Sequence, residues 1–572
     1  MSSEDTETTC LISRSAVPPS DRRPKRTCCQ LMANSSIMLG RELCYGVEAA
    51  LVVPHLLTRG MPANMYSLVF LIPPMFGFLL QPLLGSTSDR CRSPLGRRRP
   101  FILTLAVTIM VGLILFLNDD NVVKVLFPAD VHSRSANVVR LVIGTVGAVL
   151  FMFGADSIEG PVRAYLLDTC NTEDQRKGLD LQAVFAGLGG VLGYLSGAVN
   201  WRTLGVPPGS EDLVRFGMCF SLFVICAVLN LFSIPEEPFV RPGSSKNKVE
   251  YTNRDTKVCV LTISTEESLA RQGSSEIKEE YTNRDTKVRV LTISTEDRMG
   301  ARQNGLEQTT GNRTNHLTQV KLIQSQENDT PEYVLTALEK SVSITPATFF
   351  KSIVKMPGRL ARLCLTQLIS WLGFMAIMLF FTDFMGRRVY GGAPQAAAGS
   401  EARRRYEAGV EMGCWGLTIN AAACALISGL AEFFLRRLSL RTVYMGGALF
   451  FALGMVGMVV LVELTTESWP LLLLCPVMGL MYSTLSIVPY RLLSQYHRNE
   501  QYVTTGADGS GRRGMGVDCA LLTAQIQLSR VIIGAVMGPV VNAAGTLTVT
   551  VVMAGGLGFC AFLAAAFLLQ YD

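Results

Sequence analysis

Charged side chains interrupt several of the long apolar runs in this sequence. Glu48 lies in the middle of the first run, and Asp156 lies near the end of the fourth. Ionisable groups are costly inside a bilayer, so such residues usually face a protein interior and have a function there. Because burial favours the neutral form of a carboxyl group, a carboxylate in a closed cavity can bind and release a proton. We therefore assign Glu48 and Asp156 to proton coupling.

A second group of charged residues is assigned to a substrate pathway through the same runs. It comprises Glu159, Arg163, Asp168, Asp383, Asp518 and Arg530. At Asp383 and Asp518, which lie near the ends of their runs, a structural ion pair explains the charge at least as well. A neutral sugar would also need hydrogen-bonding amides and an aromatic face. The candidates are Gln81, Tyr165, Gln182, Trp371 and Gln525.

The short loop GSTSDRCRSPLGRRRP, residues 85–100, concentrates charge between two apolar runs. Asp89 is expected at a helix C-terminus, where the helix dipole disfavours an anion, so it needs a cationic partner. A cluster of this kind can hold one state of a transporter closed and break in the other. The alternative is a plain anchor of arginines at the inner membrane surface. We assign Gly85, Asp89, Arg90, Gly96, Arg97, Arg98 and Arg99 to a gating loop.

Composition indicates which elements must position these residues. The chain has 572 residues, of which 49% are hydrophobic and 17% are charged, whereas soluble domains carry about 25% charge. Apolar runs of about 20 residues are long enough to cross a bilayer as helices. Twelve such runs predict an all-α membrane protein with two six-helix bundles. They lie near 35–58, 66–86, 100–118, 138–160, 180–199, 214–233, 361–382, 410–431, 443–463, 470–490, 516–541 and 546–569.

The same pattern predicts four segments and an orientation. We expect a cytoplasmic tail at 1–34, a bundle at 35–233, a cytoplasmic linker at 234–360 and a second bundle at 361–572. Lysine and arginine concentrate in loops that lie on one side, which favours a cytoplasmic location for both termini. The loop after the seventh run is an exception, because it places Arg387, Arg388, Arg403, Arg404 and Arg405 on the other side.

The linker contains a duplicated segment at 250–296. EYTNRDTKVCVLTISTE recurs after 30 residues as EYTNRDTKVRVLTISTE, and two copies are too few for a solenoid. Its flanks are rich in polar residues, which predicts a mostly disordered tether. An alternative interpretation is that the apolar residues of the two copies form a short strand pair or a strip that binds a partner.

Longer motifs in both halves resemble a known family. The loop pattern G-x-x-x-D-R followed by G-R-R-R is similar to the signature loop of the major facilitator superfamily. GRELCYGVEAA, EGPVRAYLLD, LFFTDFMG, RRGMGVDCA and VNAAGTLTV together resemble solute carrier family 45, whose relatives include the sucrose–proton symporters of plants. The resemblance implies the superfamily fold and proton-coupled transport of sucrose, glucose or fructose by alternating access.

The second half is most similar to a melanosomal member of that family. This implies a melanosomal or related endolysosomal membrane, and a role in lumenal pH, melanin synthesis and pigmentation. Glu7, Leu11 and Ile12 have the spacing of an acidic dileucine signal, which sorting adaptors read.

One position departs from the family pattern. The family has an acidic residue one helical turn before the one that matches Asp156, but this chain has Met152 there. Residues at i and i+4 share a helix face, so our hypothesis is that Asp156 takes over the proton. Arg530 is a second departure, since relatives have an uncharged polar residue there. We expect Arg530 either to pair with an acid across the bundle or to change which substrate is accepted.

Two other functions remain open at this stage. Intramembrane carboxylates also suit a polyamine or other organic-cation transporter, and Met152 is compatible with a sensor that does not transport. We expect no enzyme activity, no cofactor and no metal, because the four histidines show no metal or triad spacing. We expect a small-molecule sugar, protons and membrane lipid as partners. We expect no nucleic acid, because the basic residues flank membrane spans.

Overall fold

The fold was analysed in a computed structural model. It describes residues 23–58, 66–89, 91, 93–126, 133–199, 201, 203–207, 210–236, 356–397, 399–465, 467–498 and 514–571, with four short strands between 260 and 323. These residues divide into two units, a helical body and a small sheet formed by part of the linker. Arg90, and the sorting signal proposed at Glu7, Leu11 and Ile12, lie outside the described residues.

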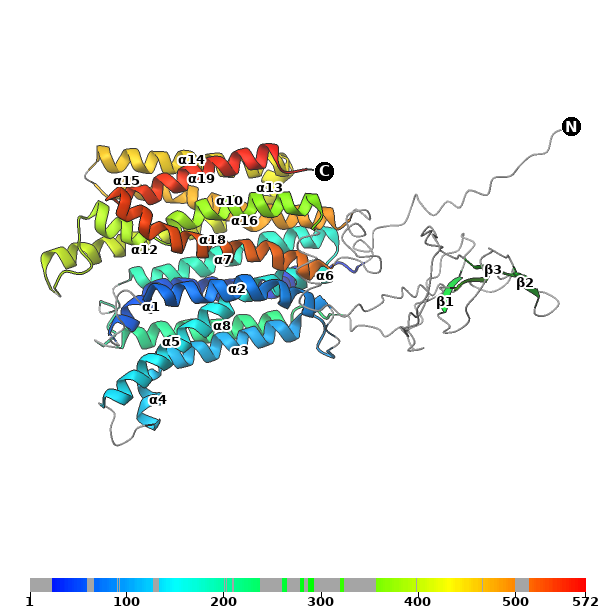
Figure 1. Cartoon of the computed structure of the whole chain (residues 1–572), viewed down its shortest axis with the longest axis horizontal. Helices are drawn as coiled ribbons and strands as arrows, with labels where there is room; N and C mark the ends of the chain where they lie inside the picture. Colours follow the sequence, from blue (N-terminus) through cyan, green and yellow to red (C-terminus); the bar gives the residue numbers. More distant parts are fainter. Residues whose placement is uncertain are drawn as a thin grey trace, which may run out of the picture. The chain divides into compact units, whose positions relative to one another are not determined.

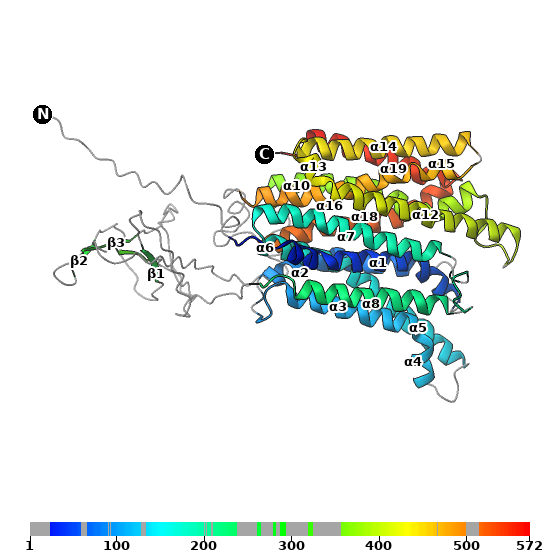
Figure 2. The same cartoon turned by 180° about the vertical axis from the view of Figure 1, so that it is seen from behind.

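Two sets of long, roughly parallel helices form the helical body (Figures 1 and 2). The first set is α1 (Cys28–Thr58), α2 (Tyr66–Asp89), α3 (Arg99–Leu117), α4 (Asp119–Leu126), α5 (Arg134–Ser157), α6 (Glu159–Thr169), α7 (Thr172–Ala198) and α8 (Glu211–Leu231). The second set is α10 (Gly358–Met378), α11 (Phe381–Phe384), the π-helix η1 (Met385–Val389), α12 (Glu401–Gly429), α13 (Ala431–Leu435), α14 (Leu440–Leu464), α15 (Trp469–Leu472), α16 (Cys475–Tyr496), α18 (Met515–Ala544) and α19 (Thr548–Phe567).

These helices match the predicted membrane spans. Within the described part of the chain, ten helical segments are long and apolar enough to cross a bilayer. Helices α1 and α2 occupy the first two predicted positions and have 31 and 24 residues. On α3 the side chains of Ile102, Leu105 and Ile109 are buried, whereas Leu103 and Val107 are exposed. An exposed apolar face beside a buried one is what a helix between lipid and protein requires.

Glycines let helices approach closely at several crossings. A Cβ atom on Gly46 of α1 would lie 2.4 Å from the Cα of Gly193 on α7. A Cβ atom on Gly85 of α2 would lie 2.6 Å from the carbonyl oxygen of Gly516 on α18. The second crossing joins the two bundles. It lies at the end of the body where α2 ends and α18 begins, which we call the basic end.

The second unit contains a four-stranded antiparallel sheet. Its strands are β1 (Val260–Ser264), β2 (Lys278–Tyr281), β3 (Lys287–Thr292) and β4 (Gln319–Ile323), in the order β1-β4-β3-β2. The two copies of the duplicated segment supply β1 and β3, and both copies pair with β4. The strands of the two copies therefore flank a third strand and do not form a pair with each other.

Candidate transport site

A group of buried and half-buried charged and aromatic side chains lies between the two bundles. We call it the central cluster: Arg41, Glu42, Tyr45, Glu48, Asp156, Glu159, Arg163, Tyr482 and Arg530. Its first-bundle members lie on α1, α5 and α6, and its second-bundle members on α16 and α18. Helices from different bundles must pack together to form it.

Asp156 and Arg530 form an ion pair across the two bundles. The Nη1 of Arg530 contacts the Oδ1 of Asp156, which is only 1% exposed. The hydroxyl of Tyr45 donates to the same oxygen at 2.6 Å, and the Tyr45 ring lies under the Arg530 guanidinium at 4.7 Å. The opposing charges and the aromatic face together compensate for burying the guanidinium.

The remaining charges form a chain from one bundle to the other. Arg41 pairs with Glu42 at 2.6 Å and with Glu159 at 2.8 Å. Arg163 lies 3.4 Å from Glu159. On the other side, the hydroxyl of Tyr482 donates to Glu42 at 2.6 Å.

Within the described part of the chain, Glu48 is the carboxylate of this cluster that is not paired with a cation. Three arginines face four carboxylates, and those of Glu42, Asp156 and Glu159 are paired with arginine. Among the described residues, the Oε2 of Glu48 is buried and has no hydrogen-bond partner. Arg530 attracts Glu48 electrostatically as well as Asp156. A proton or a cationic group would complete the charge balance.

The gating loop forms a second cluster at the basic end, the gate cluster of Asp89, Arg97, Arg98, Arg99 and Asp168. The Nη2 of Arg98 contacts Asp89 and lies 2.7 Å from Asp168, and Arg97 lies 3.5 Å from Asp168. Burial disfavours charge on Arg98, but the carboxylates of Asp168 and Asp89 outweigh it and raise the pKa of Arg98 well above its usual value. Arg98 is therefore the central cation of the gate cluster.

Asp89 also binds the first turn of a helix in the other bundle. The backbone N–H groups of Gly516 and Val517, at the start of α18, donate to its two carboxylate oxygens at 3.1 and 3.0 Å. A helix N-terminus carries unpaired N–H donors and a partial positive charge, so it binds a carboxylate well. The carboxylate is unfavourable at the end of its own helix, α2, and is stabilised by the start of α18.

Glu236 anchors the start of the linker to the gating loop. Its carboxylate accepts the N–H of Arg98 at 2.9 Å and that of Arg99 at 3.3 Å. A Cβ atom on Gly96, whose φ is +110°, would lie 2.1 Å from the Oε2 of Glu236, so glycine is needed there. Burial raises the pKa of Glu236, and the N–H donors of Arg98 and Arg99 oppose that rise.

A third contact joins the bundles beside the gate cluster. Arg491 on α16 pairs with Asp180 on α7 and lies 3.6 Å from Glu432 on α13. One turn further along α16, the Ser494 hydroxyl donates to the side-chain oxygen of Gln175 on α7 at 2.6 Å. The basic end is thus held by polar contacts at two places.

Comparison with known proteins identifies this architecture. The family model described as Major Facilitator Superfamily matches residues 38–400. The chain is 36% identical to the mouse (Mus musculus) Membrane-associated transporter protein, over 98% of this chain and 97% of that protein. It is 30% identical to the human (Homo sapiens) Solute carrier family 45 member 4, over 96% of this chain and 88% of that protein. The chain belongs to solute carrier family 45 of the major facilitator superfamily.

Two further similarities agree with this assignment. The human Proton-associated sugar transporter A is 30% identical over 92% of this chain and 84% of that protein. The solved structure of the proton:xylose symporter XylE aligns with a TM-score of 0.52 at 10% identity, covering 93% of this chain and 94% of that one. At that identity the likeness concerns the fold alone. A family 45 chain of this superfamily is a transporter and not an enzyme.

The family 45 fold brings some of the residues predicted for the site together and separates others. Glu48, Asp156, Glu159, Arg163 and Arg530 all lie in the central cluster. Three do not: Asp168 is paired in the gate cluster, Asp518 contacts His497 at 2.8 Å near the start of α18, and Asp383 lies 3.3 Å from Arg387 after α10. Those three carboxylates have structural partners away from the central cluster.

Sequence reasoning assigned no site role to several members of the central cluster, or to Glu236 beside the gate cluster. Arg41, Glu42 and Tyr45 lie one or two turns from Glu48 on α1, so helical spacing places them near the same site. Tyr482 lies in an uncharged apolar run and gives no such signal. Glu236 directly follows the sixth run in the sequence PEEP, and its acidity beside a membrane end could have marked it.

The glycine crossing at the basic end gives a stability prediction. Gly85→Val would place its Cβ atom 2.6 Å from the Gly516 carbonyl oxygen and 2.7 Å from the Cβ of Ala520. We expect a lower free energy of unfolding, by about 1–3 kcal/mol, because overpacking forces the helices apart. Thermal unfolding of the purified protein measures it. Gly217→Val is the matched control, since a Cβ atom there meets nothing within 4 Å; an equal loss in both variants would contradict the prediction.

Proposed function

We propose that this protein is a proton-coupled sugar transporter that works by alternating access. Its substrates are sucrose, glucose or fructose, and its location is the melanosome or a related endolysosomal membrane, where it affects lumenal pH and melanin synthesis. The observation that carries the proposal is the Asp156–Arg530 pair between the bundles, beside Glu48, which has no paired cation among the described residues. An ion pair between moving halves couples a change of protonation to a change of conformation.

In the proposed mechanism Arg530 is shared by two carboxylates. With Arg530 on Asp156, the isolated Glu48 carboxylate takes up a proton from the lumenal side and the buried charge is balanced. When the bundles move, Arg530 separates from Asp156 and pairs with Glu48. The proton passes from Glu48 to Asp156, which is then neutral without its arginine. Release of the proton to the cytoplasm restores the Asp156–Arg530 pair. The position one turn before Asp156 is occupied by Met152, so Asp156 is the acidic residue on that face of α5.

Buried, unpaired polar atoms on the helices of both bundles suit the hydroxyl groups of a sugar. Among the described residues, the Nε and Nη1 of Arg163 and both side-chain amide atoms of Gln182 are buried without a hydrogen-bond partner. The Trp371 indole packs edge-on against Tyr482 at 5.9 Å, and its Nε1 is also unpaired. Aromatic faces beside buried donors and acceptors are typical of sites for small polar ligands.

The gate cluster supplies the conformational part of the mechanism. Asp89 joins α2 to α18, and Arg491 joins α16 to α7, so both contacts must break for the basic end to open. We place the basic end in the cytoplasm, because the arginine-rich loops lie there. The name of one relative, Membrane-associated transporter protein, supports transport. The name of another, Proton-associated sugar transporter A, supports sugar and protons as the species transported.

Uptake measurements test the proposal directly. Radiolabelled sucrose, glucose and fructose are offered to cells that carry the protein in the plasma membrane, with the lumenal face toward acidic or neutral medium. We expect acid to stimulate uptake in the native protein. We expect Asp156→Asn to abolish that stimulation while exchange of labelled for unlabelled sugar continues, because exchange requires no net proton movement. Glu48→Gln should also lose acid stimulation, since its side chain is already neutral.

The control is Glu411→Gln, which removes an exposed carboxylate from α12 outside the central cluster. Acid-stimulated sugar uptake that survives in Asp156→Asn would contradict the proposed role of Asp156. No sugar uptake at either pH, in protein shown to reach the surface, would contradict sugar transport. Uptake of a labelled polyamine under those conditions would identify a cation transporter, the alternative favoured by the excess carboxylate at Glu48.

A further inference from the structure

Residues 23–26, which we call the strap, lie against the end of α6. The Nη1 of Arg23 donates to the backbone carbonyls of Leu167 and Cys170, at 3.0 and 3.1 Å. The last carbonyls of a helix have no partner within it, and its C-terminus carries a partial negative charge. A guanidinium group suits that position, because it combines a positive charge with several N–H donors. The strap therefore fastens the start of the first bundle to the end of α6.

Arg26 connects the strap to the turn between α6 and α7 at two further points. Its Nη2 donates to the carbonyl of Thr169 at 3.2 Å, and its backbone N–H donates to the Oδ2 of Asp174, on α7, at 2.7 Å. Asp174 is only 4% exposed, so the second bond lies largely out of water. Lys25, between the two arginines, differs from them. It pairs at 3.3 Å with Glu173, and both of these side chains are more than half exposed.

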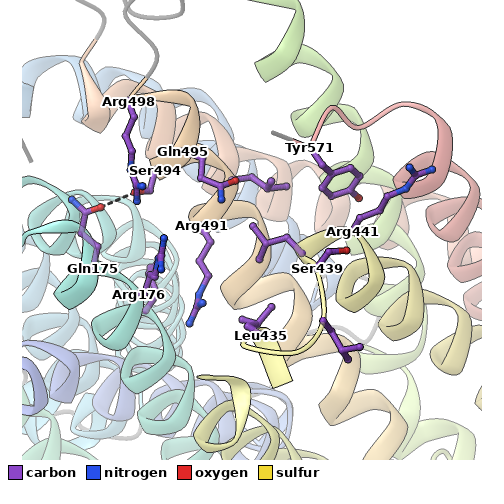
Figure 3. Close-up of a pocket in the computed structure, with 14 residues that line it drawn as sticks. Gln175, Arg176, Leu435, Ser439, Arg441, Arg491, Ser494, Gln495, Arg498 and Tyr571 are labelled. Atoms are coloured by element: carbon purple, nitrogen blue, oxygen red, sulfur yellow. Dashed lines mark hydrogen bonds between the residues drawn. The ribbon is translucent and has the colours of Figure 1, made fainter. Parts of the chain in front are cut away.

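The turn that the strap holds also carries a contact between the bundles. The Nε2 of Gln175, on α7, donates to the same two carbonyls as Arg23, those of Leu167 and Cys170, at 2.8 and 3.1 Å. With its nitrogen held in this way, the amide of Gln175 accepts the hydroxyl of Ser494, from the second bundle, at 2.6 Å (Figure 3). Both side chains are buried. Two shared carbonyls therefore connect the strap to a contact between the bundles.

The end of α6 also carries a member of the gate cluster. Asp168 directly follows Leu167 and lies 2.7 Å from Arg98. Arg98 in turn contacts Asp89, which binds the start of α18. Arg23 attracts Asp168 electrostatically. Displacement of the end of α6 would therefore disturb both the gate cluster and the amide contact beside it.

We propose that Arg23 and Arg26 are positioning residues for closure of the basic end. By fixing the end of α6, they hold Gln175 where the second bundle contacts it and Asp168 where it pairs with Arg98. They thereby favour the closed conformation. The inference rests on the alternating-access mechanism proposed above, and it adds the N-terminal tail to that mechanism. Because coupling between two equilibria is reciprocal, release of the strap and opening of the basic end should promote each other.

Two native cysteines report these two events separately. Cys170 is fully buried at the end of α6, and burial raises the pKa of its thiol to about 11. Because the thiolate is the reactive form, Cys170 should react slowly while the strap is in place and faster once it leaves. Cys519, which is fully buried near the start of α18, reports opening of the basic end. Peptide mass spectrometry after timed exposure of the purified full-length protein to a thiol reagent measures both rates, with no sugar present.

Matched variants of the strap distinguish positioning from a general loss of positive charge. Arg23→Gln should raise the rate at Cys170 by roughly tenfold, the effect of losing one charge-assisted contact. It should raise the rate at Cys519 by about fivefold, at the lower end of common coupling between sites. Lys25→Gln removes the same charge from the same segment and should leave both rates unchanged, because exposed ion pairs contribute little. Arg23→Lys keeps the charge and should react more slowly at both cysteines than Arg23→Gln.

Faster reaction at both cysteines in Arg23→Gln, with native rates in Lys25→Gln, supports the inference. A rise at Cys170 alone would show that the strap leaves without opening the basic end, and would overturn it. Unchanged rates at both cysteines, or equal rises in Arg23→Gln and Lys25→Gln, would overturn it as well.

Asp89→Asn separates failure of the strap from failure of the gate, because it removes the charge that binds the start of α18. Reciprocal coupling predicts that this variant also raises the rate at Cys170. If Asp89→Asn raises the rate at Cys519 and Arg23→Gln does not, the gate stands and the strap inference fails. If neither variant raises it, the gate of the proposed mechanism fails and the strap inference fails with it.

Discussion

Replacement of Asp89 by asparagine is expected to open the basic end of the transporter. The carboxylate contacts Arg98 and accepts the N–H groups of Gly516 and Val517 from the other bundle. Asparagine keeps the shape of the side chain but loses the charge that pairs with Arg98 and with the start of α18. Hydrogen bonds to a charged group contribute about 1.5–3 kcal/mol each. We therefore expect the closed conformation to lose about 2–4 kcal/mol relative to the open one.

Alkylation of a native cysteine reports this change. Cys519 lies one turn into α18 and is fully buried in the closed structure, so its thiol reacts only when the basic end opens. Peptide mass spectrometry after timed exposure to a thiol reagent measures the rate at this one residue. The expected rise for Asp89→Asn is at least about tenfold, because a loss of 1.4 kcal/mol corresponds to that factor in population.

A carboxylate at the opposite end of the body provides the control for this experiment. Glu463, at the end of α14, pairs with Arg388 at 2.5 Å and is well exposed. Glu463→Gln should leave the rate at Cys519 unchanged. If Asp89→Asn and the native protein react at the same rate, the contacts of Asp89 with α18 do not hold the basic end closed.

Replacement of Arg530 by glutamine is expected to be more damaging than removal of both members of its ion pair. Arg530 is the cation for Asp156, which is 1% exposed. Removing one partner of a buried pair leaves the other charge uncompensated, which costs about 3–5 kcal/mol. The double variant Asp156→Asn/Arg530→Gln leaves no such charge. It should therefore recover much of the free energy of unfolding that Arg530→Gln loses.

Thermal unfolding of the native protein, the two single variants and the double variant forms a double-mutant cycle that measures this coupling. Arg530→Lys should lose less stability than Arg530→Gln, because it keeps the charge, although its ammonium lacks the planar stacking on Tyr45. Arg530→Gln should also fail to transport at any pH. Additive losses in the cycle would show that the two side chains are energetically independent and would contradict the proposed role of Arg530.

The sequence alone was sufficient for the architecture and for part of the site. Apolar runs and their charges predicted the two helical bundles, because an α-helix satisfies its own backbone in lipid and its length follows from the bilayer. Intramembrane charges marked Glu48, Asp156, Glu159, Arg163 and Arg530, because a charge in an apolar run is rarely retained without a role. The gating loop could be predicted for a similar reason, because Asp89 at a helix C-terminus needs a cationic partner.

Only the tertiary structure decided which of these residues meet. Asp156, Glu42 and Asp180 have partners in the other bundle, Arg530, Tyr482 and Arg491, which follow them by more than 300 residues. Helical spacing relates residues within one turn or two, and it carries no information about which face of another bundle packs opposite. Asp168 and Asp518 looked like members of a substrate pathway, but Asp168 lies at the end of α6 and Asp518 at the start of α18, both at the basic end of the body. Their depth along the packed helices, and not their charge, determined what they contact.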